Sequence, residues 1–202
     1  MNKKIKNLEY SRNTNKQINF YEKFYKFIDN LNLPKHEFSK YFPVFNTRQN
    51  VSRFVETYEY WNLIKNIPGS IIECGAGSGQ FMMSMAHLSS IFEPHHYTRK
   101  IIGFDTFNGF KGITSKDKSS KAKHLKQGGL TYTSYAYLKK IIKFYDQNRM
   151  IGNINKVEVI KGDISKTFPD YVKKNPSLVI SLLHLDLDLY KPTKDTLKIA
   201  IE

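Results

Sequence analysis

The sequence predicts an α/β fold with a parallel sheet, and three observations lead to this prediction. Residues 70–86 read as a short apolar strand, a turn with glycine at every second position, and the start of an apolar helix. Two further segments, 100–105 and 157–161, have the composition of strands, with a helical segment between them. The run 178–188 is almost continuously apolar, which is typical of a strand buried on both faces of a parallel sheet. Strand, glycine turn and helix in this order form the first βα unit of a nucleotide-binding sheet.

Length and composition set the limits for this fold. The 202 residues suit one domain, and Cys74 is the only cysteine, so a disulfide framework is ruled out and a reducing compartment is expected. No apolar run approaches the roughly 20 residues that span a bilayer, and the basic start at residues 1–6 lacks the apolar segment of a signal peptide. We therefore expect no membrane segment and a cytoplasmic protein.

The net charge of +14 has two interpretations. A strongly basic chain can bind an anionic partner such as nucleic acid. The lysines are spread along the whole chain, however, and the composition is rich in Lys, Asn, Ile and Tyr throughout. No Arg-rich or RNP-like aromatic motif is present, so a general compositional bias explains the charge better than a nucleic-acid partner does.

The N-terminal third predicts helices and no strand. Apolar residues recur at helical spacing in residues 18–31, and this helix ends before Pro34. A second amphipathic helix is predicted for residues 51–65. We expect residues 1–66 to form a helical cap region and residues 67–202 to form the sheet domain.

The glycine turn favours one class of nucleotide over two others. A dinucleotide-binding turn needs glycine at position 80, where Gln80 stands, and the Gly-Lys-Ser/Thr of a phosphate-binding P-loop is absent. The pattern present is E-x-G-x-G-x-G, starting at Glu73, which resembles motif I of the class I S-adenosylmethionine (SAM)-dependent methyltransferases. A carboxylate beside the turn suits the ammonium group of SAM and would repel a pyrophosphate.

Acidic residues follow the next two predicted strands. Asp105 ends the strand 100–105, where a carboxylate can accept hydrogen bonds from ribose hydroxyls; it could instead cap a helix. Asp163 follows the strand 157–161 at the position where such a sheet brings a polar group to the adenine. Residues 111–130 are rich in Gly, Lys and Ser and read as a long loop, followed by a helix over about 134–146.

Two acids lie near the end of the apolar run 178–188. Asp186 and Asp188 are two residues apart, so a strand would place them on the same side. With these residues, four segments resemble the macrocin O-methyltransferase (TylF-like) family in order: 67–75, 103–110, 162–169 and 183–193. The motifs G-F-D-T-F-x-G-F and L-D-x-D-x-Y-x-x-T are the specific ones, and the resemblance covers roughly residues 50 to 202.

This resemblance implies a Rossmann-like class I methyltransferase three-layer sandwich and a transfer of methyl from SAM to a sugar or small-molecule hydroxyl. It also implies the residues that bind SAM: Glu73, Gly75, Gly77 and Gly79 at the methionine part, Asp105 at the ribose, and Asp163 with the Ile164 backbone at the adenine. Asp186 would ligate Mg²⁺ and help to deprotonate the acceptor, and Asp188 would shape the same catalytic pocket.

The resemblance also implies that part of the domain is absent. The family's sheet has seven strands, of which four are found here, and a pair of acids that completes its metal site follows a strand beyond residue 202. We therefore expect a C-terminally incomplete domain. Its partner should be a small-molecule acceptor of the sugar type, and neither a nucleic acid nor a membrane. A homo-oligomer is compatible with the sequence. Two alternatives remain: a basic nucleic-acid-binding module and a non-catalytic Rossmann-like partner domain.

Overall fold

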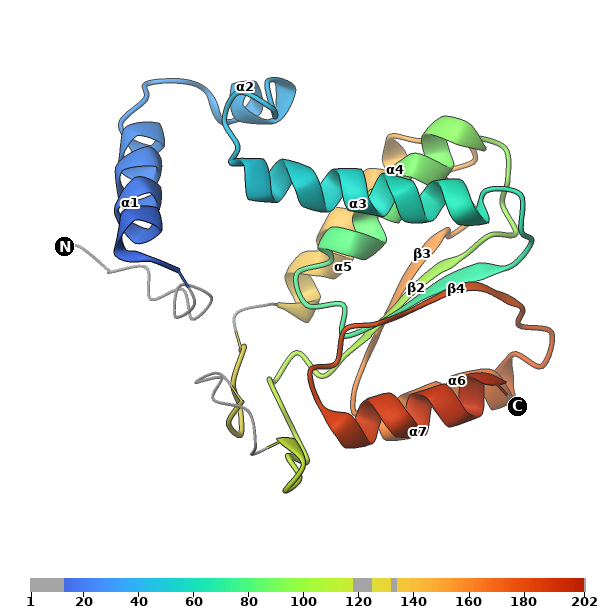
Figure 1. Ribbon diagram of the computed structural model, residues 1–202. Coiled ribbons are helices and arrows are strands. Elements are labelled where there is room, and N and C mark those ends of the chain that lie inside the picture. The colour runs from blue at the N-terminus through green and yellow to red at the C-terminus, as the bar shows by residue number, and fades with distance from the viewer. Residues whose placement is uncertain (1–12, 118–124, 132–133, 202) are drawn as a thin grey trace. The chain divides into compact units, whose positions relative to one another are not determined.

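The structure is a computed structural model and describes residues 13–117, 125–131 and 134–201 (Figure 1). The chain divides into two compact units, one up to Arg53 and the other from Phe54 onward. The boundary falls inside a helix, so the division expected near residue 66 stays a prediction. No helix in the described ranges is long and apolar enough to cross a membrane.

The first unit is helical where it is described. It contains α1 (Asn15–Asp29), α2 (Lys35–Lys40) and the start of α3 (Arg48–Ile64). Thr14 begins α1 with a capping box, because its hydroxyl accepts the Gln17 N–H while the Gln17 side chain accepts the Thr14 N–H. The helix expected from the spacing of residues 18–31 is thereby confirmed, although it buries none of its residues.

The second unit contains one four-stranded parallel sheet. Its strands are β1 (Ser70–Cys74), β2 (Ile101–Asp105), β3 (Val157–Lys161) and β4 (Ile180–Leu185). Their order is β3-β2-β1-β4, and all three pairings are parallel. Strands β1, β2 and β3 therefore follow one another toward one edge of the sheet, and β4 pairs with the opposite side of β1. The carboxyl ends of β1, β2 and β4 meet at this reversal, where open α/β sheets bind ligands.

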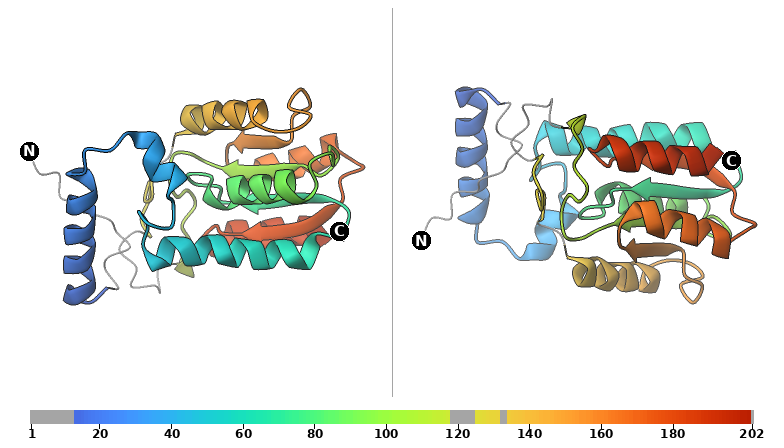
Figure 2. Two further views of the ribbon diagram at one scale, coloured as in Figure 1. Left: turned by 90° about the horizontal axis from the view of Figure 1, so that it is seen from above. Right: turned by 90° about the horizontal axis from the view of Figure 1, so that it is seen from below.

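Helices cover both faces of the sheet, giving the expected three layers (Figures 1 and 2). The C-terminal half of α3 lies on one face with α4 (Gln80–Phe92) and α5 (Tyr135–Gln147), and α6 (Ile164–Lys174) and α7 (Tyr190–Ile201) lie on the other. Each face has its own apolar core, the first containing Trp61 and Met85 and the second Phe104 and Phe168. The predicted α/β fold is confirmed.

Strand β4 is shorter and less buried than the sequence predicted. The strand was expected over 178–188 with both faces buried, but it ends at Leu185 and all six of its residues are half-buried. It ends there because its partner β1 ends at Cys74, whose carbonyl oxygen accepts the N–H of Asp186. Among the described residues, β4 pairs with β1 alone and is an edge strand. The expected burial was therefore wrong.

The predicted loop 111–130 falls partly outside the description. Residues 118–124 are not among the described residues, and the remaining parts contain neither an α-helix nor a strand. The helix predicted after this loop is α5, which Ser134 caps by accepting the Tyr137 N–H.

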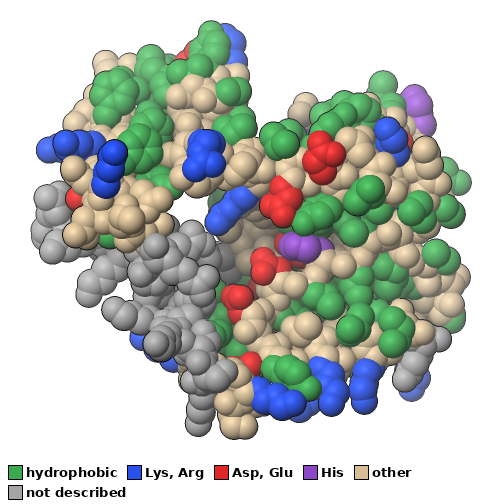
Figure 3. Space-filling model, viewed as in Figure 1, with side chains coloured by type: hydrophobic (Ala, Val, Ile, Leu, Met, Phe, Trp, Pro, Cys, Tyr) green, Lys and Arg blue, Asp and Glu red, His purple; other side chains and the backbone are tan. Residues whose placement is uncertain are grey.

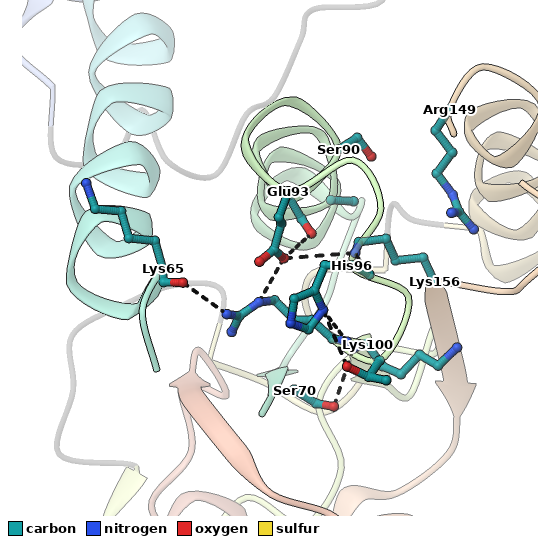
Figure 4. Close-up of polar contacts among 12 residues, drawn as sticks. Lys65, Ser70, Ser90, Glu93, His96, Lys100, Arg149 and Lys156 are labelled. Atoms are coloured by element: carbon teal, nitrogen blue, oxygen red, sulfur yellow. Dashed lines mark hydrogen bonds and ion pairs between the residues drawn. The ribbon is translucent and has the colours of Figure 1, made fainter. Parts of the chain in front are cut away.

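A buried polar network joins the ends of several elements on the side of the sheet where β1 begins (Figure 4). The Arg99 side chain is 2% exposed and donates to the Glu93 carboxylate at 2.8 Å. Its other N–H groups reach the carbonyl oxygens of Gly69 and Lys65 and the hydroxyl of Ser181. One side chain therefore ties the turn before β1, the end of α3 and the start of β4 to the loop after α4.

Candidate functional site

The glycine turn between β1 and α4 lies at the reversal point of the sheet. Gly75, Gly77 and Gly79 all have positive φ, at 97°, 51° and 85°. A Cβ added to Gly75 would lie 2.0 Å from the carbonyl oxygen of Asp186, so only glycine allows β1 and β4 to end this close together. A Cβ at Gly77 would meet nothing nearer than 3.9 Å. The turn is therefore packed tightly at Gly75 and open at Gly77, where a ligand can approach the backbone.

Asp105, at the end of β2, contacts the glycine turn directly. Its Oδ2 accepts the Gly77 N–H at 2.9 Å, and its Oδ1 accepts the Phe107 N–H at 2.6 Å. Phe107 has a φ of 52° and no helix begins there, so the helix-cap alternative for Asp105 was wrong. Each carboxylate oxygen has a second lone pair, so the half-buried Asp105 can still accept hydrogen bonds from a ligand.

Glu73 lies beneath the turn and is almost inaccessible. The residue is 3% exposed, and its Oε2 accepts the N–H of Met82 in the first turn of α4 at 3.1 Å. Burial raises the pKa of Glu73 to about 7, although the neighbouring His184 and the Met82 N–H act in the opposite direction. Glu73 therefore supports the start of α4 from beneath the turn, and its expected role in binding a cofactor stays a prediction.

Glu73→Gln is expected to change the pH dependence of stability. The pKa of Glu73 is raised from 4.5 to about 7 in the folded chain, so the unfolded chain loses this proton first as the pH rises. The contribution of Glu73 to the wild-type free energy of unfolding should therefore fall, by up to about 3 kcal/mol, between about pH 4.5 and 7. Urea unfolding at pH 5 and pH 8 measures this. The stability of the Gln variant relative to wild type should increase with pH, and an unchanged difference would contradict the assignment.

Asp163 and Ile164 take local roles at the start of α6. Asp163 is the exposed N-cap, and its Oδ1 accepts the Ser165 N–H at 3.0 Å. The Ile164 side chain is 5% exposed and packs in the second core, so only its backbone can face a ligand. Their expected contact with an adenine stays a prediction.

Asp186 and Asp188 lie just beyond β4, and both are exposed. Since the strand ends at Leu185, the alternation that would place both carboxylates on one side no longer applies. Asp188 has a φ of 56°, a left-handed conformation that costs energy for a residue with a Cβ. The backbone therefore turns sharply between the sheet and α7 at the two acids that the sequence singled out. Their catalytic roles stay predictions.

Several acidic side chains and a histidine lie close to one another on the face shown in Figure 3. Within the described ranges, however, no three His, Cys, Asp or Glu side chains converge on a point where they could hold a metal ion. A hard cation such as Mg²⁺ needs several oxygen ligands, and Asp186 offers one carboxylate. The described residues therefore do not fit a complete Mg²⁺ site.

Two residues at this end of the sheet were missed by the sequence analysis. His184 lies opposite Glu73 in the β1–β4 register; its position two residues before Asp186 was a signal that could have found it. Asp117 is buried and accepts the N–H of Tyr190, the first residue of α7, at 2.7 Å, and both N–H and hydroxyl of Thr114. The hydrogen bonds, first that of the Thr114 hydroxyl, lower the pKa of Asp117. No sequence pattern indicates this contact across 73 positions.

Residues 28–201 match the macrocin O-methyltransferase (TylF) family. A comparison with curated proteins gives no match.

Solved structures of methyltransferases resemble this fold. The crystal structure of CalS11, a calicheamicin methyltransferase, has a TM-score of 0.87 and 28% identity, covering 93% of this chain and 74% of that one. The apo structure of CalS11, described as a TDP-rhamnose 3'-O-methyltransferase, gives a TM-score of 0.76 and 27% identity, with 93% and 73% covered. The O-methyltransferase NovP, with a TM-score of 0.55, 20% identity and coverage of 72% and 57%, supports the fold alone.

Proposed function

Because the chain belongs to the macrocin O-methyltransferase (TylF) family, and is thus an O-methyltransferase, we propose that it transfers the methyl group of SAM to a hydroxyl of a sugar-type small molecule. One observation supports the cofactor most strongly: Asp105 at the end of β2 bonds to Gly77 of the open glycine turn. This joins a carboxylate that suits ribose hydroxyls to a backbone that a ligand can approach.

The residues around the turn fit SAM, whose sulfonium supplies an electrophilic methyl group. Gly77 keeps the backbone free of a side chain, so the methionine part can lie against the turn there, and Gly75 lets the ends of β1 and β4 come close together beside it. Glu73 provides a negative charge beneath the ammonium group, and Asp105 accepts the ribose hydroxyls. Asp163 and the Ile164 N–H meet the adenine edge from the start of α6. Most of these contacts orient SAM, and in-line methyl transfer depends above all on the orientation of the methyl group toward the acceptor.

The acceptor is proposed to bind beside the turn 186–190. CalS11 is described as acting on TDP-rhamnose, a sugar nucleotide, which favours a sugar-type acceptor for this chain also. Asp186 and Asp188 are exposed and follow the carboxyl end of β4, and the backbone of Asp186 lies close to Gly75 of the glycine turn. Either can accept the proton that the hydroxyl loses, the role of a general base. Because the described residues do not complete a Mg²⁺ site, we assign no step to the metal, and the role of Asp186 as a ligand stays a prediction.

S-adenosylhomocysteine (SAH), the product form of the cofactor, is expected to raise the melting temperature of the chain. At a concentration 100 times its Kd, a ligand of the native state adds about 2.7 kcal/mol, which corresponds to roughly 5–10 °C for a protein of this size. Differential scanning fluorimetry measures the shift. NAD at the same concentration is the control, because Gln80 stands where a dinucleotide turn needs glycine. No shift with SAH, or an equal shift with NAD, would count against the proposal.

The family membership favours this enzyme over the two alternatives. A nucleic-acid-binding module would show retention on oligonucleotides that falls steeply with salt. A non-catalytic partner domain would bind no SAH. A cytoplasmic location and a homo-oligomer stay predictions.

A further inference from the structure

His184 lies against the buried carboxylate beneath the glycine turn. The parallel register of β1 and β4 places His184 opposite Glu73, and the His184 Nδ1 is 3.7 Å from the Glu73 Oε1. The Nδ1 atom is buried and forms no hydrogen bond with any residue that the structure describes, because its separation from Oε1 is slightly too long. The contact with Glu73 is therefore electrostatic, and Glu73 raises the pKa of His184.

A second contact fixes the orientation of the histidine ring. The ring stacks on Phe81, with centroids 4.0 Å apart and planes inclined by 24°. Phe81 belongs to the first turn of α4, and the next residue, Met82, donates its N–H to the other oxygen of Glu73. Glu73 is thus held from two sides, by the start of α4 and by a ring that α4 itself keeps in place.

The carboxylate needs this second contact. A buried carboxylate with one hydrogen bond is costly to keep charged, since burial favours the neutral form. The described polar groups around it are the Met82 N–H on Oε2 and the His184 ring beside Oε1, with Asp186 adding a like charge. Without the imidazole, the Met82 N–H would be the remaining polar contact among these groups, and the like charge of Asp186 would still oppose ionisation of Glu73.

We propose that His184 is a positioning residue for cofactor binding, which holds the Glu73 carboxylate beneath the turn so that its charge faces the amino-acid end of SAM. This inference rests on the proposed function. It assigns His184 no contact with the cofactor: the histidine acts through Glu73, and Phe81 holds the histidine.

Two substitutions of His184 distinguish the contribution of its ring from that of its polar nitrogen. His184→Phe keeps a ring that can stack on Phe81 and removes the polar atom beside Glu73. His184→Asn places an amide nitrogen near the position of Nδ1 and removes the ring. Isothermal titration calorimetry with SAH is expected to show about tenfold weaker binding for the Phe variant and at most about threefold for the Asn variant. His87→Phe is the matched control on α4, because His87 packs edge to face on Tyr145, and its Kd should stay that of the wild type.

A double-mutant cycle tests whether His184 acts through Glu73. In a Glu73→Gln background, His184→Phe should change the Kd of SAH by less than about twofold, since the two side chains act as one unit. A purely structural role of His184 would weaken binding equally in both backgrounds, and that result overturns the inference. It is also overturned if Glu73→Gln alone leaves the Kd unchanged, a measurement that does not depend on the folding of the Phe variant. If the wild type itself binds no SAH, the proposed function is wrong, and the inference that rests on it is wrong with it.

Discussion

Asp105→Ala is expected to weaken the binding of SAH by about 100-fold. The wild-type carboxylate would accept two ribose hydroxyls, and hydrogen bonds to a charged acceptor contribute roughly 1.5 kcal/mol each, so their loss amounts to about 3 kcal/mol. The variant would also free the N–H groups of Gly77 and Phe107, which the carboxylate now holds at 2.9 and 2.6 Å. The turn would then lose its orientation as well as its ribose contact.

Two further variants make this measurement specific. Asp105→Asn retains one acceptor oxygen and should lose about tenfold in affinity. Asp170→Ala changes an exposed acid on α6, away from the turn, and should bind SAH like the wild type. Isothermal titration calorimetry gives the three dissociation constants. A Kd for Asp105→Ala within threefold of the wild type would mean that Asp105 only supports the turn, and the ribose role would have to be abandoned.

The parts of this site that could be predicted from the sequence are local in the chain. The strand, glycine turn and helix can be recognised within the single segment 70–86, because backbone conformation and hydrophobic spacing are local properties. Asp105 could be located from the rule that ligands bind at the carboxyl ends of parallel strands. The hydrogen bond between Asp105 and Gly77 could not be predicted, because it depends on the exact position of the glycine turn relative to the end of β2.

The parts that could not be predicted depend on sheet order or on distant contacts. His184 meets Glu73 only because the last strand returns to the side of β1, an arrangement that no segment encodes alone. Helix α7 was not predicted from the sequence, and Pro192 lies in its first turn. Proline is tolerated there because the first turn of a helix leaves its N–H groups without helical partners. One of these groups, the N–H of Tyr190, is satisfied instead by Asp117.

Arg99→Met is expected to be the most destabilising single change outside the site. Arg99 is almost fully buried, and its removal leaves the carboxylate of Glu93 in the interior, with the Lys156 ammonium 4.0 Å away and a hydrogen bond from the Ser89 hydroxyl (Figure 4). Breaking a buried ion pair on one side costs about 3–5 kcal/mol, which corresponds to a fall in melting temperature of roughly 6–20 °C here. The carbonyl oxygen of Gly69 would also lose a donor.

The same network predicts how that loss can be partly reversed. Removing both charges avoids a Glu93 carboxylate that is buried without its guanidinium partner. The double variant Arg99→Met with Glu93→Met should therefore be more stable than Arg99→Met alone by at least about 1 kcal/mol. The recovery cannot be complete, because burial lowers the pKa of Lys156 to about 8 and Glu93 is the group that opposes this shift. Lys191→Ala, which breaks the exposed pair with Asp195, is the control and should leave the stability close to that of the wild type, because water screens the two charges. Thermal and urea unfolding of the four proteins give these differences. A double variant less stable than Arg99→Met would show that Glu93 supports this corner through Lys156 and Ser89 and not mainly through Arg99.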